Sequence, residues 1–148
     1  MKLSKKSRYG LRALIDLAVN SIRGHVSLNS IAERNEISPQ YLEQVFAALR
    51  RAGIVKSVKG PQGGYLLNGE ADEITLAQIL EALEGTYYLE PEEKLDNPDS
   101  QKIAETVQEL LIDRVNEETE RLLKEITLAD LEKGYLEKKG YDQNMYYI

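Results

Sequence analysis

The chain has 148 residues, of which 42% are hydrophobic and 30% are charged, and it contains no cysteine. This composition is typical of a folded globular protein, and it excludes a disulfide framework, a thiolate metal site and a thiol redox sensor. The N-terminal segment has charges but no apolar stretch behind them, so we expect a cytoplasmic protein that does not bind membranes.

The net charge of -6 conceals two halves of opposite sign. Residues 1–69 carry 11 Lys and Arg against 4 Asp and Glu, a net charge of +7. Residues 70–148 carry 8 Lys and Arg against 21 Asp and Glu, a net charge of -13. A basic segment of this kind favours nucleic-acid binding, whereas the alternative is that the charges are only the solvated faces of helices.

An amphipathic helix is predicted near the N-terminus. Its apolar residues follow the i, i+3, i+4, i+7 spacing of a helix with one buried face, and Gly24 is expected to end it. The residues of this face are Leu11, Leu14, Ile15, Ala18 and Ile22.

Two short helices joined by a tight turn are predicted next. Residues 29–37, "NSIAERNEI", form the first helix and the turn, and residues 38–53 form the second. Ser38 is a favourable N-cap, Pro39 suits the first helical position and Gly53 follows the last turn. Such a pair is a helix-turn-helix, whose second helix reads DNA. Its buried stripe is Leu42, Val45, Phe46 and Leu49, and its outer face carries Gln40, Glu43, Gln44, Ala47 and Arg51.

The stretch "VKSVKGPQGGYLL", residues 55–67, is typical of a strand, a glycine turn and a second strand. On its own the glycine pair indicates only a hairpin turn. Behind a helix-turn-helix, the hairpin is the wing of a winged helix. Lys56 and Lys59 would contact phosphates, while Gly63 and Gly64 would let the tip approach DNA closely. No GK[ST] follows the glycines, which excludes a P-loop.

A capped helix is predicted after the wing, from Thr75 to Gly85, followed by a helix from about residue 97 to 125. This second helix has a narrow apolar stripe, and its length of roughly 25 residues, about 40 Å, exceeds what so small a domain covers. Antiparallel pairing in a homodimer would bury the stripe, which consists of Ile103, Val107, Leu110, Leu111, Val115, Leu122 and Ile126.

Nothing in the sequence indicates catalysis. The single histidine, His25, has no cysteine or second histidine with which to hold a metal, so a structural or exposed histidine is expected. No nucleophile motif is present, and adjacent carboxylates such as Glu117 and Glu118 lie in acidic surface segments. The protein is therefore not expected to be an enzyme.

The chain resembles a family of small winged-helix repressors that includes CymR, IscR and NsrR. The resemblance rests on "RYGLRALIDLA" (8–18), on residues 26–67, on "EITLAQILEALEG" (73–85) and on "ITLADL" (126–131), together about half the chain. It implies a homodimer bound to a partly palindromic operator in double-stranded DNA. Many members hold an iron-sulfur cluster on three cysteines. The corresponding residues 86–100, "TYYLEPEEKLDNPDS", contain neither Cys nor His, so no cofactor is expected.

The resemblance also implies where DNA is contacted. Gln40, Gln44 and Glu43 have side chains that can pair with base edges, whereas the basic residues near the N-terminus suit phosphates. At Lys59, members of the family commonly have arginine, which fits a narrow minor groove better. The implied set is Lys5, Lys6, Arg8, Ser38, Gln40, Tyr41, Glu43, Gln44, Arg51, Lys56, Lys59, Gly63 and Gly64.

The ending, "NMYYI", is similar to that of the cluster-less, cysteine-metabolism members of the CymR type. The resemblance implies a complex with cysteine synthase, a pyridoxal-phosphate enzyme, in which the C-terminal carboxylate enters the enzyme's active site. Folding of this apolar tail onto its own domain is the alternative. The residues concerned are Met145, Tyr146, Tyr147 and Ile148.

The predicted class is mainly α with a small β wing. Residues 1–85 form a winged helix-turn-helix DNA-binding domain, and residues 86–148 form an acidic dimerisation helix and a tail. The function expected is a dimeric transcriptional repressor of cysteine metabolism. Two alternatives remain: a protein-interaction module that retains the fold, and a repressor of the same family that responds to a small-molecule ligand.

Overall fold

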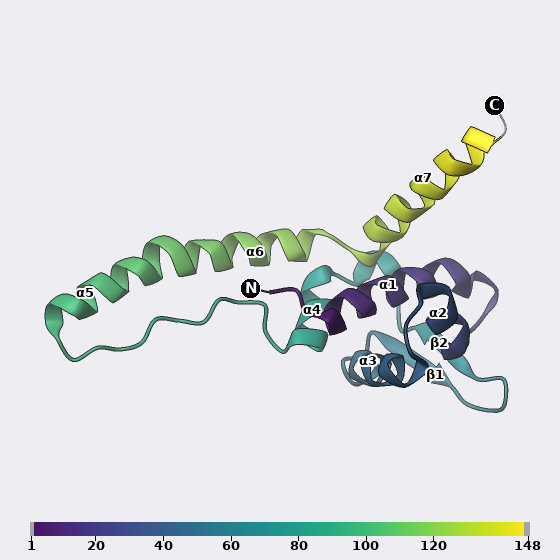
Figure 1. Cartoon of the computed structure of the whole chain (residues 1–148), viewed down its shortest axis with the longest axis horizontal. Helices are drawn as coiled ribbons and strands as arrows, with labels where there is room; N and C mark the ends of the chain where they lie inside the picture. The colour runs from purple at the N-terminus through teal and green to yellow at the C-terminus, as the bar shows by residue number, and fades with distance from the viewer. Residues whose placement is uncertain (1, 147–148) are drawn as a thin grey trace.

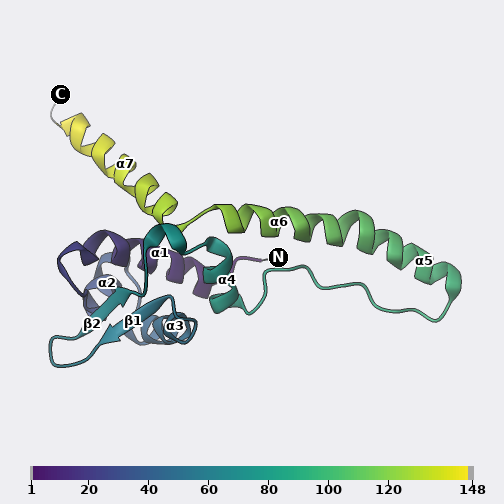
Figure 2. The ribbon, with the colours of Figure 1, turned by 180° about the vertical axis from the view of Figure 1, so that it is seen from behind.

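The computed structural model describes residues 2–146, with side chains described for residues 2–140. A winged-helix domain carries a long arm and a projecting C-terminal helix (Figure 1), and the same arrangement is seen from behind in Figure 2. The predicted class, mainly helical with a two-stranded wing, is confirmed. The elements are α1 (Lys5–Asn20), α2 (Leu28–Asn35), α3 (Pro39–Arg51), β1 (Val55–Val58), β2 (Gly64–Leu67), α4 (Leu76–Glu84), α5 (Pro98–Val107), a π-helical turn (Gln108–Ile112), α6 (Asp113–Glu125) and α7 (Leu128–Tyr146).

Polar caps and one unusual residue fix the helix boundaries in the domain. The hydroxyl of Ser38 accepts a hydrogen bond from the main-chain N–H of Tyr41 at 3.1 Å, which starts α3 as predicted. Thr75 and Gln78 form a reciprocal capping box at the start of α4. Between α2 and α3, Glu36 adopts a left-handed conformation with φ of 55°, which makes the helix-turn-helix connection tight.

The core of the domain contains side chains from α1, α2, α3 and α4, and its largest fully buried member is Phe46. The prediction for the first helix is correct for Leu14 and Ala18 but wrong for Ile22, which is 85% exposed. The reason is that α1 ends at Asn20 and continues as a 3-10 turn over Ser21–Arg23, so Ile22 leaves the α-helical periodicity.

The wing is anchored to the domain at its base. In the antiparallel pair, Val55 lies opposite Leu67 and Val58 opposite Gly64. Tyr65 also exchanges two main-chain hydrogen bonds with Val26, of 3.0 and 2.8 Å. The base of the hairpin is therefore held by the segment that precedes α2, and the tip extends beyond it (Figure 1).

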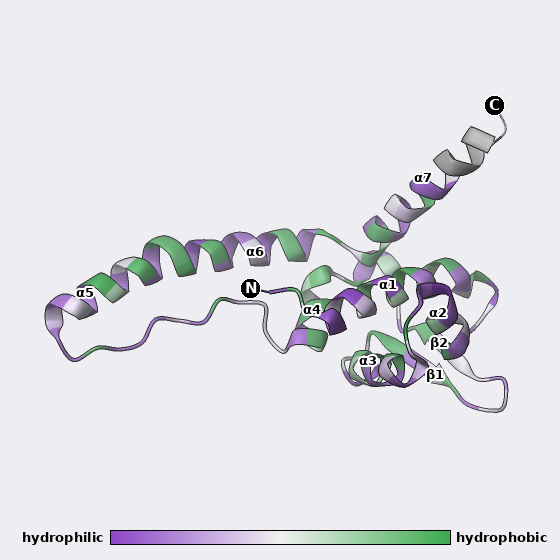
Figure 3. Ribbon diagram, viewed as in Figure 1, coloured by the Kyte–Doolittle hydropathy of each residue, from purple (hydrophilic) through white to green (hydrophobic). Residues whose placement is uncertain are grey.

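The arm consists of an extended strap, residues 86–97, and a return helix made of α5, the π-helical turn and α6 (Figure 1). The helix predicted from about 97 to 125 is thus confirmed, but its π-helical turn was not predicted. Figure 3 shows hydrophobic residues along the arm, well outside the core of the domain.

The π-helical turn aligns the apolar residues of the two halves of the arm. Each residue of a straight α-helix turns by about 100°, so Val115 would lie about 120° around the axis from Ile103. A π turn inserts one extra residue and takes back about 100° of this rotation. The consecutive apolar pair Leu110 and Leu111 lies within the turn, where the sequence pattern shifts by one position.

The chain returns to the winged-helix domain after α6. Thr127 forms an isolated antiparallel β-bridge with Thr75. Leu128 is fully buried, and its main-chain N–H donates to the main-chain oxygen of Ile74 at 2.8 Å. Ile126 is only half-buried beside the start of α4, so the structure separates it from the exposed stripe. α7 then packs against α1. Within residues 2–146, no helix combines the length and apolarity needed to span a membrane.

Candidate nucleic-acid interface

The outer face of α3 presents polar side chains to solvent. Because Leu42, Val45 and Phe46 are buried, the intervening Glu43 and Gln44 point outward. Gln40 is exposed one turn earlier, and Arg51 is exposed at the end of the helix. Amide and carboxylate groups on one exposed helix face match the donors and acceptors that bases display in a major groove.

Two of the predicted contact residues on α3 also have structural roles. The oxygen of Ser38 accepts the capping hydrogen bond, so its hydroxyl proton remains available to donate. Tyr41 is half-buried and packs edge-to-face on Tyr9, with ring centroids 5.5 Å apart. The guanidinium of Arg12 lies 5.1 Å from the centroid of the Tyr9 ring. Sequence reasoning missed Tyr9 and Arg12, which support the start of α3 from α1.

The three basic residues predicted at the start of α1 do not form one surface. Lys5 and Arg8 are exposed, and the Nε of Arg8 donates to the main-chain oxygen of Leu3 at 3.1 Å. Lys6 is half-buried, and its charge acts on Glu84 at the end of α4. Lys5 and Arg8 are therefore better placed than Lys6 for contacts with phosphates.

Glu84 joins α4 to the first turn of α1. Its carboxylate accepts hydrogen bonds from the main-chain N–H of Ser4, at 3.0 Å, and from the hydroxyls of Ser4 and Ser7. Burial raises the pKa of Glu84, but the hydrogen bonds from the two serines, with a smaller effect of Lys6, outweigh it and hold the pKa below its usual value. The basic start of α1 is thus fixed to the domain by a carboxylate.

A groove of about 460 Å³ lies between the wing, α2 and α3. Lys59 of the wing and Glu43 of α3 line it together with Ser27 and Asn29, at the start of α2. Both wing lysines, Lys56 and Lys59, are exposed. Sequence reasoning missed Ser27 and Asn29, although an N-cap serine is the local signal for exposed main-chain N–H groups that suit a phosphate.

Close main-chain packing, within the hairpin and against the segment before α2, explains the two wing glycines. A Cβ on Gly63 would lie 2.3 Å from the main-chain oxygen of Val58, and one on Gly64 would lie 2.4 Å from that of Val26. Neither has a positive φ; in this turn the positive value of 119° belongs to Gly60. Glycine is therefore required at 63 and 64 by the fold itself, whatever the wing contacts.

His25 is exposed, which is one of the two alternatives that the sequence predicted, and it contacts the wing. Its Nε2 donates to the main-chain oxygen of Gln62 at the tip of the hairpin. This hydrogen bond links the segment before α2 to the wing tip, in addition to the pairing of Val26 with Tyr65 at the wing base.

The arm exposes an apolar stripe on α5, the π-helical turn and α6. Ile103 is 68% exposed, Leu110 64% and Leu111 55%. Exposed apolar side chains gathered on one face mark an interaction surface. The other exposed members of the stripe are Val107, Val115 and Leu122.

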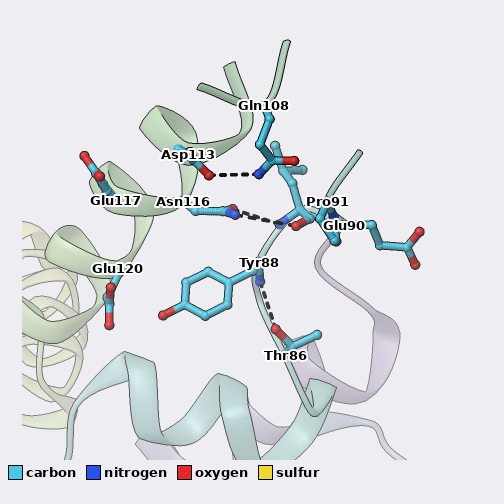
Figure 4. A pocket seen from close by; sticks show the side chains of 10 residues that line it. Thr86, Tyr88, Glu90, Pro91, Gln108, Asp113, Asn116, Glu117 and Glu120 are labelled. Carbon is cyan, nitrogen blue, oxygen red and sulfur yellow. Dashed lines mark hydrogen bonds between the residues drawn. The ribbon is translucent and has the colours of Figure 1, made fainter. Parts of the chain in front are cut away.

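Side-chain amides hold the strap against the opposite side of the helix. Three amide oxygens accept main-chain N–H groups of the strap at 2.7–2.8 Å: Asn116 from Leu89, Gln108 from Glu92 and Gln101 from Leu95. Figure 4 shows Asn116 and Gln108 beside the strap and Gln108 bonded to Asp113. A cavity of about 520 Å³ remains between strap and helix. Partial burial, followed by a hydrogen bond with Glu120 and a smaller effect of Tyr87, raises the pKa of Tyr88 in this cavity to about 12.

The strap does not fit an iron-sulfur cluster. Such clusters are held by cysteine thiolates, and the chain has no cysteine. Among the residues with described side chains, no three His, Asp or Glu side chains are grouped so that they could hold a metal ion. The strap is instead fastened by the amide hydrogen bonds described above.

Comparisons with known proteins agree with this architecture. The family model described as "Rrf2: Iron-dependent Transcriptional regulator" matches residues 3–134. The HTH-type transcriptional regulator CymR of Bacillus subtilis is 43% identical over 131 residues, which cover 88% of this chain and 89% of that protein.

Two solved structures are also similar. The structure of CymR, the global cysteine regulator of B. subtilis, has a TM-score of 0.63 at 39% identity and covers 90% of this chain and 97% of its own. The structure of T. potens IscR has a TM-score of 0.68 at 41% identity. The match covers 91% of this chain and 88% of the IscR chain. The chain thus belongs to the Rrf2 family of helix-turn-helix transcriptional regulators, and it is not an enzyme.

Proposed function

We propose that the protein is a cytoplasmic, sequence-specific repressor that binds a partly palindromic operator as a homodimer. The observation that carries this proposal is the exposed polar face of α3, with Gln40, Glu43 and Gln44, flanked by the wing lysines. In the proposed complex these three side chains read base edges. Lys5, Arg8, Arg51, Lys56 and Lys59 contact phosphates, while Lys6 contributes at longer range.

The exposed apolar stripe of the arm supports the proposed dimerisation. The arm projects from the domain, so its own chain does not cover the stripe (Figure 1). Burial of each such leucine against a second copy would contribute about 1.5–3 kcal/mol. A two-fold axis through paired arms also places two α3 helices for two half-sites of an operator.

The test is binding of the purified protein to the DNA upstream of its own gene, measured by fluorescence anisotropy against a scrambled sequence. The proposal expects at least about a thousandfold preference for the operator, the lower end of the range for specific DNA-binding proteins. Equal affinity for both DNAs would remove sequence-specific repression and leave non-specific binding through the basic half.

We further propose CymR-like control of cysteine metabolism through a complex with cysteine synthase. The similarity to CymR, the global cysteine regulator of B. subtilis, supports this assignment. The link is proposed to be the tail Met145–Ile148. Tyr147 and Ile148 lie outside the described residues, as do the side chains of Met145 and Tyr146. The start of α7 packs against α1, while its C-terminal part projects from the winged-helix domain (Figure 2).

A truncation separates this proposal from the DNA-binding one. Deletion of Met145–Ile148 should leave operator binding unchanged while abolishing the gain in operator affinity that added cysteine synthase produces. O-acetylserine, which needs the same active site, should release the full-length repressor from the enzyme. If the truncated protein gains affinity as the full chain does, the tail is not the link.

A further inference from the structure

A second cavity, of about 500 Å³, lies between α1, α2 and α7. It is distinct from the α3 face, the wing groove and the apolar stripe of the arm. Ile15 and Val19 of α1 give it an apolar lining, and three cations surround it: Arg12 of α1, Arg34 of α2 and Lys139 of α7. A cavity of this volume is within the range of small-molecule sites.

Among the described side chains, Asp16 is the only carboxylate that lines this cavity, and it is already fully engaged. Both oxygens of Asp16 accept from Arg34, at 2.7 and 2.9 Å, and further hydrogen bonds come from the side-chain amides of Asn35 and Asn20, at 3.0 and 3.2 Å. The Asp16 side chain is mostly buried. Asp16 and Arg34 therefore neutralise each other, and the charge that remains in the cavity is positive.

Arg12 and Lys139 supply that remaining charge. Among the described side chains neither forms an ion pair. Arg12 is held in place, since it donates one hydrogen bond to the main-chain oxygen of Asn35 and lies over the Tyr9 ring. Its guanidinium has five N–H donors, so most of them remain for an anion. A guanidinium that is already positioned loses little entropy when it binds one.

We propose that this cavity binds a small organic acid. The ligand's carboxylate pairs with Arg12 and Lys139, and its hydrocarbon part packs on Ile15 and Val19, with Tyr135 at the side of α7. A carboxylate fits better than a neutral ligand because no anion among the described side chains pairs with Arg12 or Lys139. Because Ile15 and Val19 are the two aliphatic residues that line the cavity, the hydrocarbon part of the ligand is expected to be one short chain or one ring.

Occupation of the site would join α7 to the helix-turn-helix. Lys139 belongs to α7, whereas Arg12 contacts the end of α2 through Asn35. An organic acid bound to both would restrain α7 relative to α2. If the proposed DNA binding is correct, this ligand and the operator would alter each other's affinity by the same factor. The binding site itself does not depend on that coupling.

The experiment uses the full chain without DNA and the probe 4-fluorobenzoate, observed by ¹⁹F NMR. Binding is expected at millimolar concentrations or below, whereas 4-fluorobenzamide, the neutral isostere, should not bind. Lys139→Gln and Arg12→Gln should each weaken binding about tenfold, the effect of one lost charge-assisted hydrogen bond of about 1.5 kcal/mol. Lys138→Gln, which removes the same charge from α7 outside the cavity lining, should have no effect.

Lys139 is exposed on α7, so its substitution leaves the fold intact even if Arg12→Gln does not. Three results would overturn the proposal: no binding of the acid, equal binding of the amide, or equal weakening by Lys138→Gln. Loss of operator affinity in Arg12→Gln, with no binding of the acid to any variant, would instead assign Arg12 to the DNA backbone.

Discussion

The buried hydroxyl of Ser7, in the first turn of α1, donates a hydrogen bond to the carboxylate of Glu84, the last residue of α4. The two residues are 77 positions apart in the sequence. Through the hydrogen bonds of Ser4 and Ser7 to Glu84, the last turn of α4 holds the basic first turn of α1 in place.

Glu84→Ala should destabilise the protein by about 1–3 kcal/mol at neutral pH, because the hydroxyl of Ser7 then has no acceptor in a buried position. Urea denaturation followed by circular dichroism measures this loss. Glu81→Ala, on an exposed position of the same helix, is the control and should change stability by less than about 0.5 kcal/mol. Equal effects of the two substitutions would show that the hydrogen bonds at Glu84 contribute little.

The same carboxylate gives the stability a pH dependence of known sign. The pKa of Glu84 is lower in the folded than in the unfolded protein, so its contribution is present above the ordinary glutamate pKa and is lost as the pH falls through the folded value. Denaturation between neutral pH and pH about 3 should therefore show a shallower acid slope in Glu84→Ala than in the natural sequence. Parallel slopes would contradict the lowered pKa.

Charge reversal of the wing, Lys56→Glu with Lys59→Glu, should weaken operator binding. The salt slope, which is the slope of the logarithm of the binding constant against the logarithm of the salt concentration, should fall in magnitude by about one for each lost phosphate contact. Anisotropy titrations over a series of salt concentrations measure the slope. Lys94→Glu, on the strap, adds negative charge away from the wing and should leave the slope unchanged. An unaltered affinity in the wing variant would exclude the wing from DNA binding.

Leu111→Glu with Leu122→Glu should give a folded monomer that fails to bind the operator, because the paired arms would then bury four carboxylates. Sedimentation velocity measures the mass, and circular dichroism checks the fold. Lys102→Gln with Arg121→Gln changes the net charge equally at exposed positions outside the stripe and should remain dimeric. A dimer of the leucine variant would place the interface elsewhere.

The π-helical turn allows a test by a change in length. Deletion of Glu109, an exposed residue of the turn, should convert it to a regular α-helix while the apolar stripe stays aligned, so that dimers persist. Insertion of one alanine after Glu109 adds a further rotation of about 100° and should break the dimer. Sedimentation velocity on both variants is the measurement, and monomers after the deletion would contradict the proposed alignment.

The sequence by itself determined the elements of this protein, because each depends on residues close together in the chain. Ser38 and Pro39 predicted the start of α3, and Thr75 and Gln78 predicted the start of α4. The spacing of Leu42, Val45 and Phe46 predicted the buried face of α3. Local periodicity failed at Ile22, where a change from α to 3-10 geometry within one turn altered the direction of the side chain.

Only the tertiary structure decided what the elements do for one another. The hydrogen bonds from Ser4 and Ser7 to Glu84, the return of Leu128 to the core and the close approach of Val26 to Gly64 join residues that are distant in sequence. The cavity with Arg12 and Lys139 likewise exists only because α7 packs back on α1. Such contacts depend on how whole helices pack, and no pattern within a single helix contains that information.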